Sequence, residues 1–439
     1  KAGWIVEGTV DQDGEHIRLT AKLIDGTSGG VVASEVFRQP ADSALVLRAS
    51  LLDGLTAQLR PRMGREINLS TRRLEAKNSV AWLLVQQADK FRRDAEAAAR
   101  QRDAETMARA FTVADSMLAA AEALDREWPE PAIQRAFVAF RRGRNTSAPA
   151  QKLAWYRESI AHADRVIARG ITAQVAGAFE NRGGSRFYQV YEHLLADQRE
   201  ADATYLKALD DLQQATKLGP RSANAWMLLS NAYAHKPDFA SSKLAAVEAY
   251  RSDPFHLAAA AILDRLYRTS YITETFHDAA QYCAEGNKRF PNDARFVQCA
   301  LWTQTFPADV RPTPSIDTVW MLADSIVKIA PPNLREFMRR EAHVVAGIVL
   351  GRLGQADSAR RVLDRVMDTP READPENDLL YYNAYARLTL GDRKTAIELL
   401  KTYLTRNPEH REGWGKDTGW WWRELKNDPE FQRLIATGS

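Results

Sequence analysis

Residues 226–254 read WMLLSNAYAHKPDFASSKLAAVEAYRSDP, and this stretch decides the fold of most of the chain. Its first half spaces four residues along one face of a helix: Trp226, Leu229, Ser230 and Tyr233. Its second half spaces small residues along another helix and ends on a proline: Ser242, Ala246, Ala249 and Pro254. Because antiparallel helices pack closely only where small side chains lie at their crossing point, the stretch predicts a helical hairpin.

The same arrangement recurs along the chain and predicts a stack of such hairpins. Two later units carry small residues and leucines at similar offsets: Gly347, Gly354, Ala359 and Leu363, then Ala384, Gly391, Ala396, Leu400 and Pro408. Gly354 and Gly391 lie 37 residues apart, close to a hairpin repeat of about 34 residues. We therefore expect helical repeats over residues 79–410, as about six to eight helix pairs with a period of about 37 to 45 residues.

The first 62 residues follow a different pattern. Apolar and polar residues alternate along one segment, as in a half-buried antiparallel strand: Ile17, Leu19, Ala21 and Leu23 against Arg18, Thr20 and Lys22. Asp13-Gly14 is a hairpin turn signal, and Asp42-Ser43 precede a leucine-rich helical stretch. Residues 1–62 therefore predict a small α/β domain of three strands and one helix, which is the partial second half of a larger domain.

Three other segments also depart from the repeat pattern. Residues 63–78 are polar and rich in arginine, and we interpret them as a linker. Prolines near residues 306–316 indicate an insertion and a flexible bend in the array. Residues 411–439, which include Trp420-Trp421-Trp422, are expected to form a C-terminal cap over the last repeat. An interface anchor or a sugar-binding platform is the alternative for the three tryptophans.

The helical region resembles the tetratricopeptide repeat (TPR), in which a large residue, a leucine, a small residue and a tyrosine line the first helix of each hairpin. Residues 7–10 (EGTV) and 18–25 (RLTAKLID) resemble part of a small α/β domain that precedes TPR arrays in bacterial receptor kinases and cyclase-like regulators. That domain is related to the N-terminal domain of the Tol-system periplasmic protein. The ending DPEFQRL, residues 428–434, resembles the tail that closes such arrays. The resemblance implies a scaffolding or sensory role.

The composition argues against several classes of protein. The 439 residues include 60 basic and 57 acidic side chains, and a net charge of only +3 argues against a dedicated nucleic-acid binder. No apolar stretch reaches the ~20 residues that span a bilayer. The chain begins at Lys1 without a methionine, so we expect a natural N-terminal portion before it, through which any membrane association would occur.

Motifs for catalysis or cofactor binding are not found in the sequence. It contains no Gly-x-Ser-x-Gly nucleophile turn, no His-Glu-x-x-His zinc motif and no phosphate-binding glycine loop. His193, His277 and His343 fall within expected helices and are interpreted as core-edge or surface residues, not metal ligands. Cys283 and Cys299 match no metal-binding spacing; we expect two small buried side chains on neighbouring helices, and a bridge between them stays open. We expect no enzyme activity, cofactor or metal.

The remaining candidates lie on the first helix of each hairpin, where TPR arrays line a concave groove. If Trp226 holds the fourth position of its repeat, the predicted groove residues are Asn224, Met227, Asn231, His235, Arg352, Tyr381 and Tyr385. An asparagine at the place of Asn231 resembles the one with which TPR domains hold a peptide backbone, but Met227 stands where the carboxylate-binding version has a lysine. These residues favour an apolar or extended peptide; alternatively, they only pack against neighbouring helices.

We therefore expect a non-enzymatic scaffold module that binds a protein or peptide, and no nucleic acid. One alternative is a structural subunit of a larger multi-protein or cell-surface assembly, in which an open sheet edge pairs with a partner strand. Another is the sensory region of a bacterial signalling protein whose output domain is absent from this chain. We expect a location in the bacterial cell envelope or periplasm, with the cytoplasm as the alternative.

Overall fold

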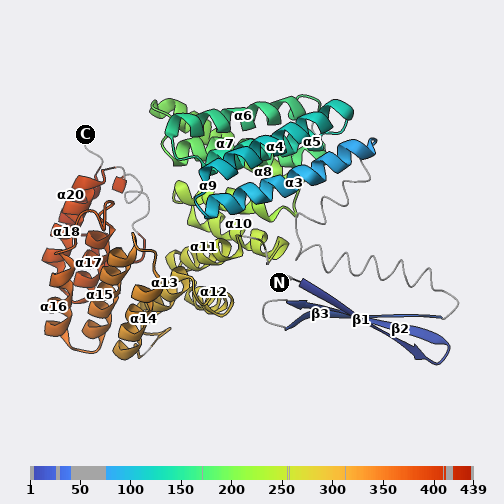
Figure 1. Cartoon of the computed structure of the whole chain (residues 1–439). Helices are drawn as coiled ribbons and strands as arrows, with labels where there is room; N and C mark the ends of the chain where they lie inside the picture. Colours follow the sequence, from blue (N-terminus) through green and yellow to red (C-terminus); the bar gives the residue numbers. More distant parts are fainter. Residues whose placement is uncertain are drawn as a thin grey trace. The chain divides into compact units, whose positions relative to one another are not determined.

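The computed structural model describes residues 4–25, 30–40, 76–170, 172–254, 256, 258–311, 313–408, 410–411 and 419–436. Within them the expected mainly α fold is confirmed: a three-stranded sheet comes first, and helical hairpins follow one another along the chain (Figure 1). The chain divides into two compact units, Lys1–His235 with Val247–Ala259 (unit 1) and Lys236–Ala246 with Ala260–Ser439 (unit 2). The predicted helix after residue 43 and most of the predicted linker lie outside the described residues.

The sheet of unit 1 is an antiparallel meander of three strands: β1 (Trp4–Asp13), β2 (His16–Asp25) and β3 (Val31–Pro40). Gly14, in the predicted turn between β1 and β2, has φ +64°, a left-handed conformation that glycine adopts without steric cost. The alternation predicted for β2 is confirmed, because Ala21 and Leu23 are buried while Arg18 and Lys22 are exposed. The side chains of Ala21 and Leu23 therefore lie on the buried face of the sheet, and those of Arg18 and Lys22 lie on the exposed face.

The described helices of unit 1 form successive hairpins. They are α3 (Ser79–Arg100), α4 (Ala104–Leu124), α5 (Glu130–Asn145), α6 (Pro149–Ile167), the 3₁₀ turn η1 (Ala173–Val175), α7 (Ala176–Tyr191), α8 (Gln198–Leu218) and α9 (Ala223–His235). Helix α3 packs on α4, α5 on α6 and α7 on α8. In addition α3 contacts α5, α5 contacts α7 and α7 contacts α9, so the odd-numbered helices form one layer. Alanines such as Ala88, Ala114 and Ala178 fill the packed faces and allow this close approach.

Unit 2 continues the pattern after α10 (Phe239–Ser252), whose residues are divided between the units. Its elements are α11 (Ala259–Ile272), α12 (Phe276–Arg289), α13 (Ala294–Trp302), η2 (Thr303–Thr305), α14 (Ile316–Ile329), α15 (Arg335–Arg352), α16 (Ala356–Val366), α17 (Asp378–Thr389), α18 (Arg393–Arg406), η3 (Arg423–Leu425) and α20 (Pro429–Ile435). Helix α13 packs on α14, α15 on α16 and α17 on α18. Helix α15 also contacts both α13 and α17, so these three helices share a layer.

Small residues stand where these helices approach each other. A Cβ atom added at Gly347 of α15 would lie 2.6 Å from a methyl carbon of Leu363 on α16, a distance that real side chains do not show. Ala359, one turn before Leu363, is completely buried. The sequence motif that joined these three residues into one repeat unit therefore marks the contact between α15 and α16.

The two cysteines form a disulfide, which the sequence alone did not decide. Cys283 of α12 and Cys299 of α13 form a disulfide between residues 16 positions apart, and both residues are buried. The bond joins the second helix of one hairpin to the first helix of the next, which also pack on each other. It therefore fixes one hairpin-to-hairpin contact of unit 2 covalently.

Replacing Gly347 by alanine is expected to lower the free energy of unfolding by about 1–3 kcal/mol, because the added methyl group overlaps Leu363. Without this overlap, a glycine-to-alanine change inside a helix raises stability by about 1 kcal/mol. The sign of the change, measured by urea unfolding of the full chain, therefore tests the helix contact. Lys401→Ala, at an exposed position of α18, is the control and should stay within about 0.5 kcal/mol of wild type.

Loss of the disulfide is expected to lower the free energy of unfolding by about 3 kcal/mol, since the bond closes a short loop in the unfolded chain. Urea unfolding before and after reduction measures this loss, and the variant Cys283→Ala/Cys299→Ala should reproduce it without a reductant. Alkylation of the unreduced, denatured chain, followed by mass spectrometry, should add no label. Two labelled thiols in protein made under oxidising conditions would contradict the bond.

Candidate functional site

The predicted groove residues of unit 1 lie on α9. The side-chain amide of Asn224 donates a hydrogen bond to Glu180 Oε1 of α7 at 2.6 Å, and the Ser222 hydroxyl donates to Oε2 of the same carboxylate at 2.6 Å. Glu180 is buried, and these bonds give each of its carboxylate oxygens a hydrogen-bond donor. They also fix the start of α9 on α7. Met227 and Asn231 follow on α9 and are half-buried. Asn224 thus has a packing role in this structure, and a peptide-binding role for Met227 and Asn231 stays a prediction.

His235 ends α9 inside an aromatic cluster. Its ring lies 6.0 Å from Phe187 and 5.9 Å from Tyr191, both in edge-to-face geometry, and 6.0 Å from Tyr205. The Tyr205 hydroxyl donates to the backbone carbonyl of Ala232 at 3.0 Å. These contacts join the end of α9 to both α7 and α8.

The other three predicted groove residues, Arg352, Tyr381 and Tyr385, lie in unit 2. The Arg352 guanidinium donates to the backbone carbonyls of Phe306 at 2.6 Å and Arg311 at 2.7 Å. It therefore fastens the proline-rich insertion, where the sequence indicated a flexible bend, to the end of α15. Tyr381 and Tyr385, both on α17, instead meet the C-terminal tryptophans.

The three consecutive tryptophans pack across several helices of unit 2. Trp421 lies on Tyr385 with ring centroids 4.2 Å apart and an interplanar angle of 4°, and it also stacks on Trp302 of α13 at 5.4 Å. Trp420 meets Tyr271 of α11 edge-to-face at 5.5 Å. We use the term aromatic surface for the helix residues beneath the segment: Tyr271, Trp302, Tyr381, Tyr382 and Tyr385.

The C-terminal segment covers the last hairpin, as expected for a cap, and it also contacts earlier helices. Trp422 is 1% exposed, and its indole N–H donates to the hydroxyl of Tyr381 on α17 at 3.3 Å. Helix α20 packs on α18, and its Phe431 is buried. These contacts cover the last hairpin, whereas Trp420 and Trp421 extend to α11 and α13.

Buried polar contacts hold the aromatic surface in place. The Trp302 indole N–H donates to Glu341 Oε1 of α15 at 2.7 Å, and the Gln298 amide donates to Oε2 at 2.6 Å. Burial raises the pKa of Glu341 above its usual value, although both hydrogen bonds and Arg268 favour the charged form. Burial likewise raises the pKa of Tyr381 to about 12. The phenol therefore stays protonated at neutral pH.

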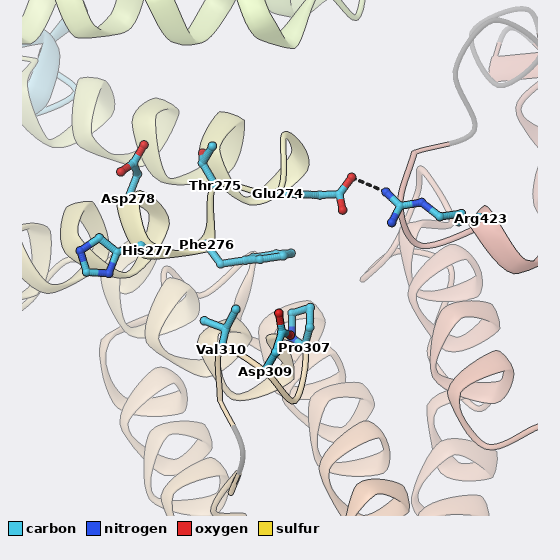
Figure 2. Close-up of a pocket in the computed structure, with 9 residues that line it drawn as sticks. All are labelled: Glu274, Thr275, Phe276, His277, Asp278, Pro307, Asp309, Val310 and Arg423. Atoms are coloured by element: carbon cyan, nitrogen blue, oxygen red, sulfur yellow. Dashed lines mark hydrogen bonds and ion pairs between the residues drawn. The ribbon is translucent and has the colours of Figure 1, made fainter.

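An open cleft of about 660 Å³ adjoins this surface (Figure 2). Its lining comes from the α11–α12 turn, the start of α12, the proline-rich insertion and the C-terminal segment: Glu274, Thr275, Phe276, His277, Asp278, Pro307, Asp309, Val310 and Arg423. Phe276 also lies 5.2 Å from the ring of Trp420, so the cleft and the aromatic surface share this residue.

The cleft carries more negative than positive charge. Glu274 forms an ion pair with Arg423, and Asp278 pairs with Lys243 Nζ at 2.8 Å. Asp309, which also lines the cleft, is exposed. With its apolar wall of Phe276 and Val310, such a cleft favours a cationic group on an apolar stem, such as a lysine or arginine side chain.

The sequence indicated a structural or binding role for the three tryptophans, but it did not indicate the cleft. The segments that line it are separated by tens of residues, and none carries a recognisable motif of its own. A basic residue directly after three tryptophans was the only local signal, and its partner Glu274 lies 149 residues earlier.

One group in the described part of the chain has the composition of a metal site: Asp115, Glu158 and His162, whose ligand atoms lie within 4.8 Å of one another. Arginines already engage two of these side chains. Arg135 Nε donates to Asp115 at 2.8 Å, and Arg165 lies 2.8 Å from His162 Nδ1. We interpret the group as an ion-pair network that joins α4, α5 and α6.

Comparison with known proteins gives similarity in fold alone. No family model and no curated protein matches this sequence. A thermophilic TPR protein from Thermus thermophilus is 15% identical, covering 48% of this chain and 99% of its own, with a TM-score of 0.34. Yeast Tom70 is 13% identical, covering 83% and 69%, with a TM-score of 0.35. The human IFIT1 dimer with m7Gppp-AAAA is 12% identical, covering 84% and 78%, with a TM-score of 0.37. Because these scores are low, the repeat architecture rests on the helix packing described above.

Glu341→Gln is expected to change the pH dependence of stability. The raised pKa means that the folded chain retains this proton at pH values where the unfolded chain, with a carboxyl near 4.5, has lost it. The contribution is fully present below the unfolded pKa and is lost as the pH rises through the folded pKa. The melting temperature of the variant relative to wild type should therefore rise over this interval.

Melting temperatures of both proteins in a series of buffers from pH 4 upward measure this effect. Glu398→Gln on α18 is the matched control, because Glu398 is exposed. Its difference from wild type should stay flat across the series. A flat difference for Glu341→Gln as well would show that the carboxyl titrates at its ordinary value.

Proposed function

We propose that this chain is a non-enzymatic scaffold module that binds a protein or peptide, and that the aromatic surface and cleft of unit 2 are its binding site. One observation carries the proposal: the odd-numbered helices of unit 2 already hold a non-helical segment of chain, through Tyr271 of α11, Trp302 of α13 and Tyr385 of α17. A surface that takes up a segment by side-chain contacts from three helices has the geometry that peptide recognition needs.

The charged groups of the site support binding better than catalysis. Glu274 and Asp278 are both engaged in ion pairs, with Arg423 and Lys243. Glu341 accepts two hydrogen bonds that position Trp302 and Gln298. In these roles the carboxylates hold neighbouring side chains or attract a cation, and neither role calls for proton transfer to a substrate.

The charge of the cleft favours a protein partner over a nucleic acid. Arg423 and Lys243 balance the charges of Glu274 and Asp278, whereas Asp309 adds a negative charge that repels a phosphate group. The same carboxylate attracts a lysine or arginine side chain. The proposed partner is therefore a polypeptide that presents apolar and cationic side chains.

The sheet supports a second candidate, a structural subunit. Among the described residues, β1 and β3 are edge strands, and β1 exposes Ile5, Val6 and Val10, the last at 66%. Exposed apolar edge strands favour pairing with a partner strand. Sizing chromatography discriminates between the candidates, because a subunit should form fixed oligomers or complexes whereas a free module should run as a monomer.

Peptides selected from a displayed random library on the immobilised full chain are expected to bind at the cleft of unit 2. Asp309→Asn removes one carboxylate charge with little change of shape. It should lower the affinity of these peptides about two- to fivefold, which is the usual contribution of an exposed charge pair. Fluorescence polarisation with each selected peptide measures the affinity.

Two further variants locate the site. Asp324→Asn removes an exposed carboxylate of α14 outside the cleft and should leave the affinity unchanged. Asn231→Ala tests the predicted groove of unit 1. Peptides that are weakened by Asn231→Ala and not by Asp309→Asn would move the binding site to α9 and contradict the assignment to unit 2.

A further inference from the structure

The chain fills the proposed site with its own residues 420–423. Trp420 and Trp421 cover the aromatic surface. Figure 2 shows Arg423 paired with Glu274 in the lining of the cleft. Aromatic and cationic side chains are the two kinds of group that this site accommodates best. The segment therefore shows what chemistry a bound partner would have.

We propose, on the basis of the function proposed above, that the site binds a partner segment with two adjacent aromatic residues and an arginine or lysine two positions after the second, and that residues 420–423 occupy the site until such a segment displaces them. The partner thus replaces Trp420, Trp421 and Arg423 in their own contacts. The chain's segment acts as a tethered competitor.

Trp420 and Trp421 both contact Tyr271 and Tyr385, but each position of the segment makes one interaction of its own kind. The Trp420 indole N–H donates to the backbone carbonyl of Tyr271 at 3.1 Å. Tyr271 lies in the last turn of α11, and its carbonyl also accepts from the Glu274 N–H at 3.3 Å, so the indole uses the second lone pair of this oxygen. The second aromatic position is read by face-to-face stacking of Trp421 on Tyr385. Glu274 selects the cation.

The surface beneath the segment is held by the helices themselves. Trp302 is fixed by its hydrogen bond to Glu341 on α15, and the Tyr271 hydroxyl lies 3.1 Å from Thr305 Oγ1 in η2. Neither contact involves residues 420–423. Trp302 and Tyr271 therefore keep their positions when the segment leaves, and preformed contacts bind a partner at a lower entropic cost.

The residues of the C-terminal segment differ in how deeply they are buried. Trp422, Leu425 and Phe431 are almost completely buried, and Asp428 caps α20 and pairs with Arg393. Trp420 and Trp421, in contrast, are partly exposed. Gly419, with φ +63°, precedes them in a left-handed conformation that glycine adopts without steric cost. Residues 420 and 421 can thus leave, and the exposed Arg423 side chain can part from Glu274, while Trp422, Leu425 and α20 stay anchored.

The test uses a fluorescein-labelled peptide of residues 419–426, GWWWRELK, and the full chain with the site vacated by Trp420→Ala/Trp421→Ala. The vacated chain should bind this peptide at least about tenfold more tightly than wild type, because the tethered competitor is gone. Arg423→Glu replaces an exposed ion pair with repulsion between two carboxylates, so the side chain leaves Glu274 and binding should tighten about two- to fivefold. Asp324→Asn should bind the peptide as wild type does.

Three controls keep the outcome unambiguous. Circular dichroism and melting temperature check that the vacated chain is folded, and Arg423→Glu, at an exposed position, gives an independent reading. Peptides with the first two tryptophans replaced by alanine, or the arginine by glutamate, should lose most of the affinity for the vacated chain. Equal binding of GWWWRELK to wild type and both variants, or binding to none of them, would overturn the proposal.

The result also separates this inference from the proposed function. Library peptides that are weakened by Asp309→Asn but bind wild type and the vacated chain equally would support the binding site and overturn the tethered competitor. Dimerisation of wild type that rises with concentration and disappears in the vacated chain would assign the segment to a second copy, and would overturn a separate partner.

Discussion

Close approach of helix backbones is the constraint on which the rest of this structure depends. At Gly347 a single added methyl group would overlap Leu363, so the packing of α15 on α16 requires that position to be empty of side chain. Because each hairpin packs this closely, the first helix of one hairpin also reaches the first helix of the next. The odd-numbered helices of unit 2 consequently present Tyr271, Trp302 and Tyr385 on one common face.

Those features of the fold that depend on local spacing were predictable from the sequence. Small residues at helical intervals marked the hairpins, and the alternation of Ala21 and Leu23 with Lys22 marked the inner face of β2. The state of Cys283 and Cys299 was not predictable, because a separation of 16 residues does not fix how two helices face each other. Only the packing of α12 on α13 brings the two sulfur atoms within bonding distance.

The candidate site could be predicted only in fragments. Tyr381 and Tyr385 were expected on a binding face and the tryptophans in a cap, but nothing local shows that Trp421 stacks on Tyr385. Contacts such as that of Trp420 with Tyr271, across 149 residues, depend on how many hairpins lie between them and how each is packed. For Asn224, the sequence predicted the position on the helix. It did not predict that the side chain donates a hydrogen bond to Glu180.

The aromatic surface explains why something must cover this face. Five large rings gathered on one side of unit 2 would expose a contiguous apolar patch of a kind that soluble chains rarely leave open. Charged residues there would remove the patch and also the recognition surface. A covering segment from the same chain protects the patch and preserves it, and its short range of contacts, from Trp420 to Arg423, leaves room for exchange. Because Glu274 adds an electrostatic requirement to an otherwise permissive apolar surface, a partner has to match both features to compete.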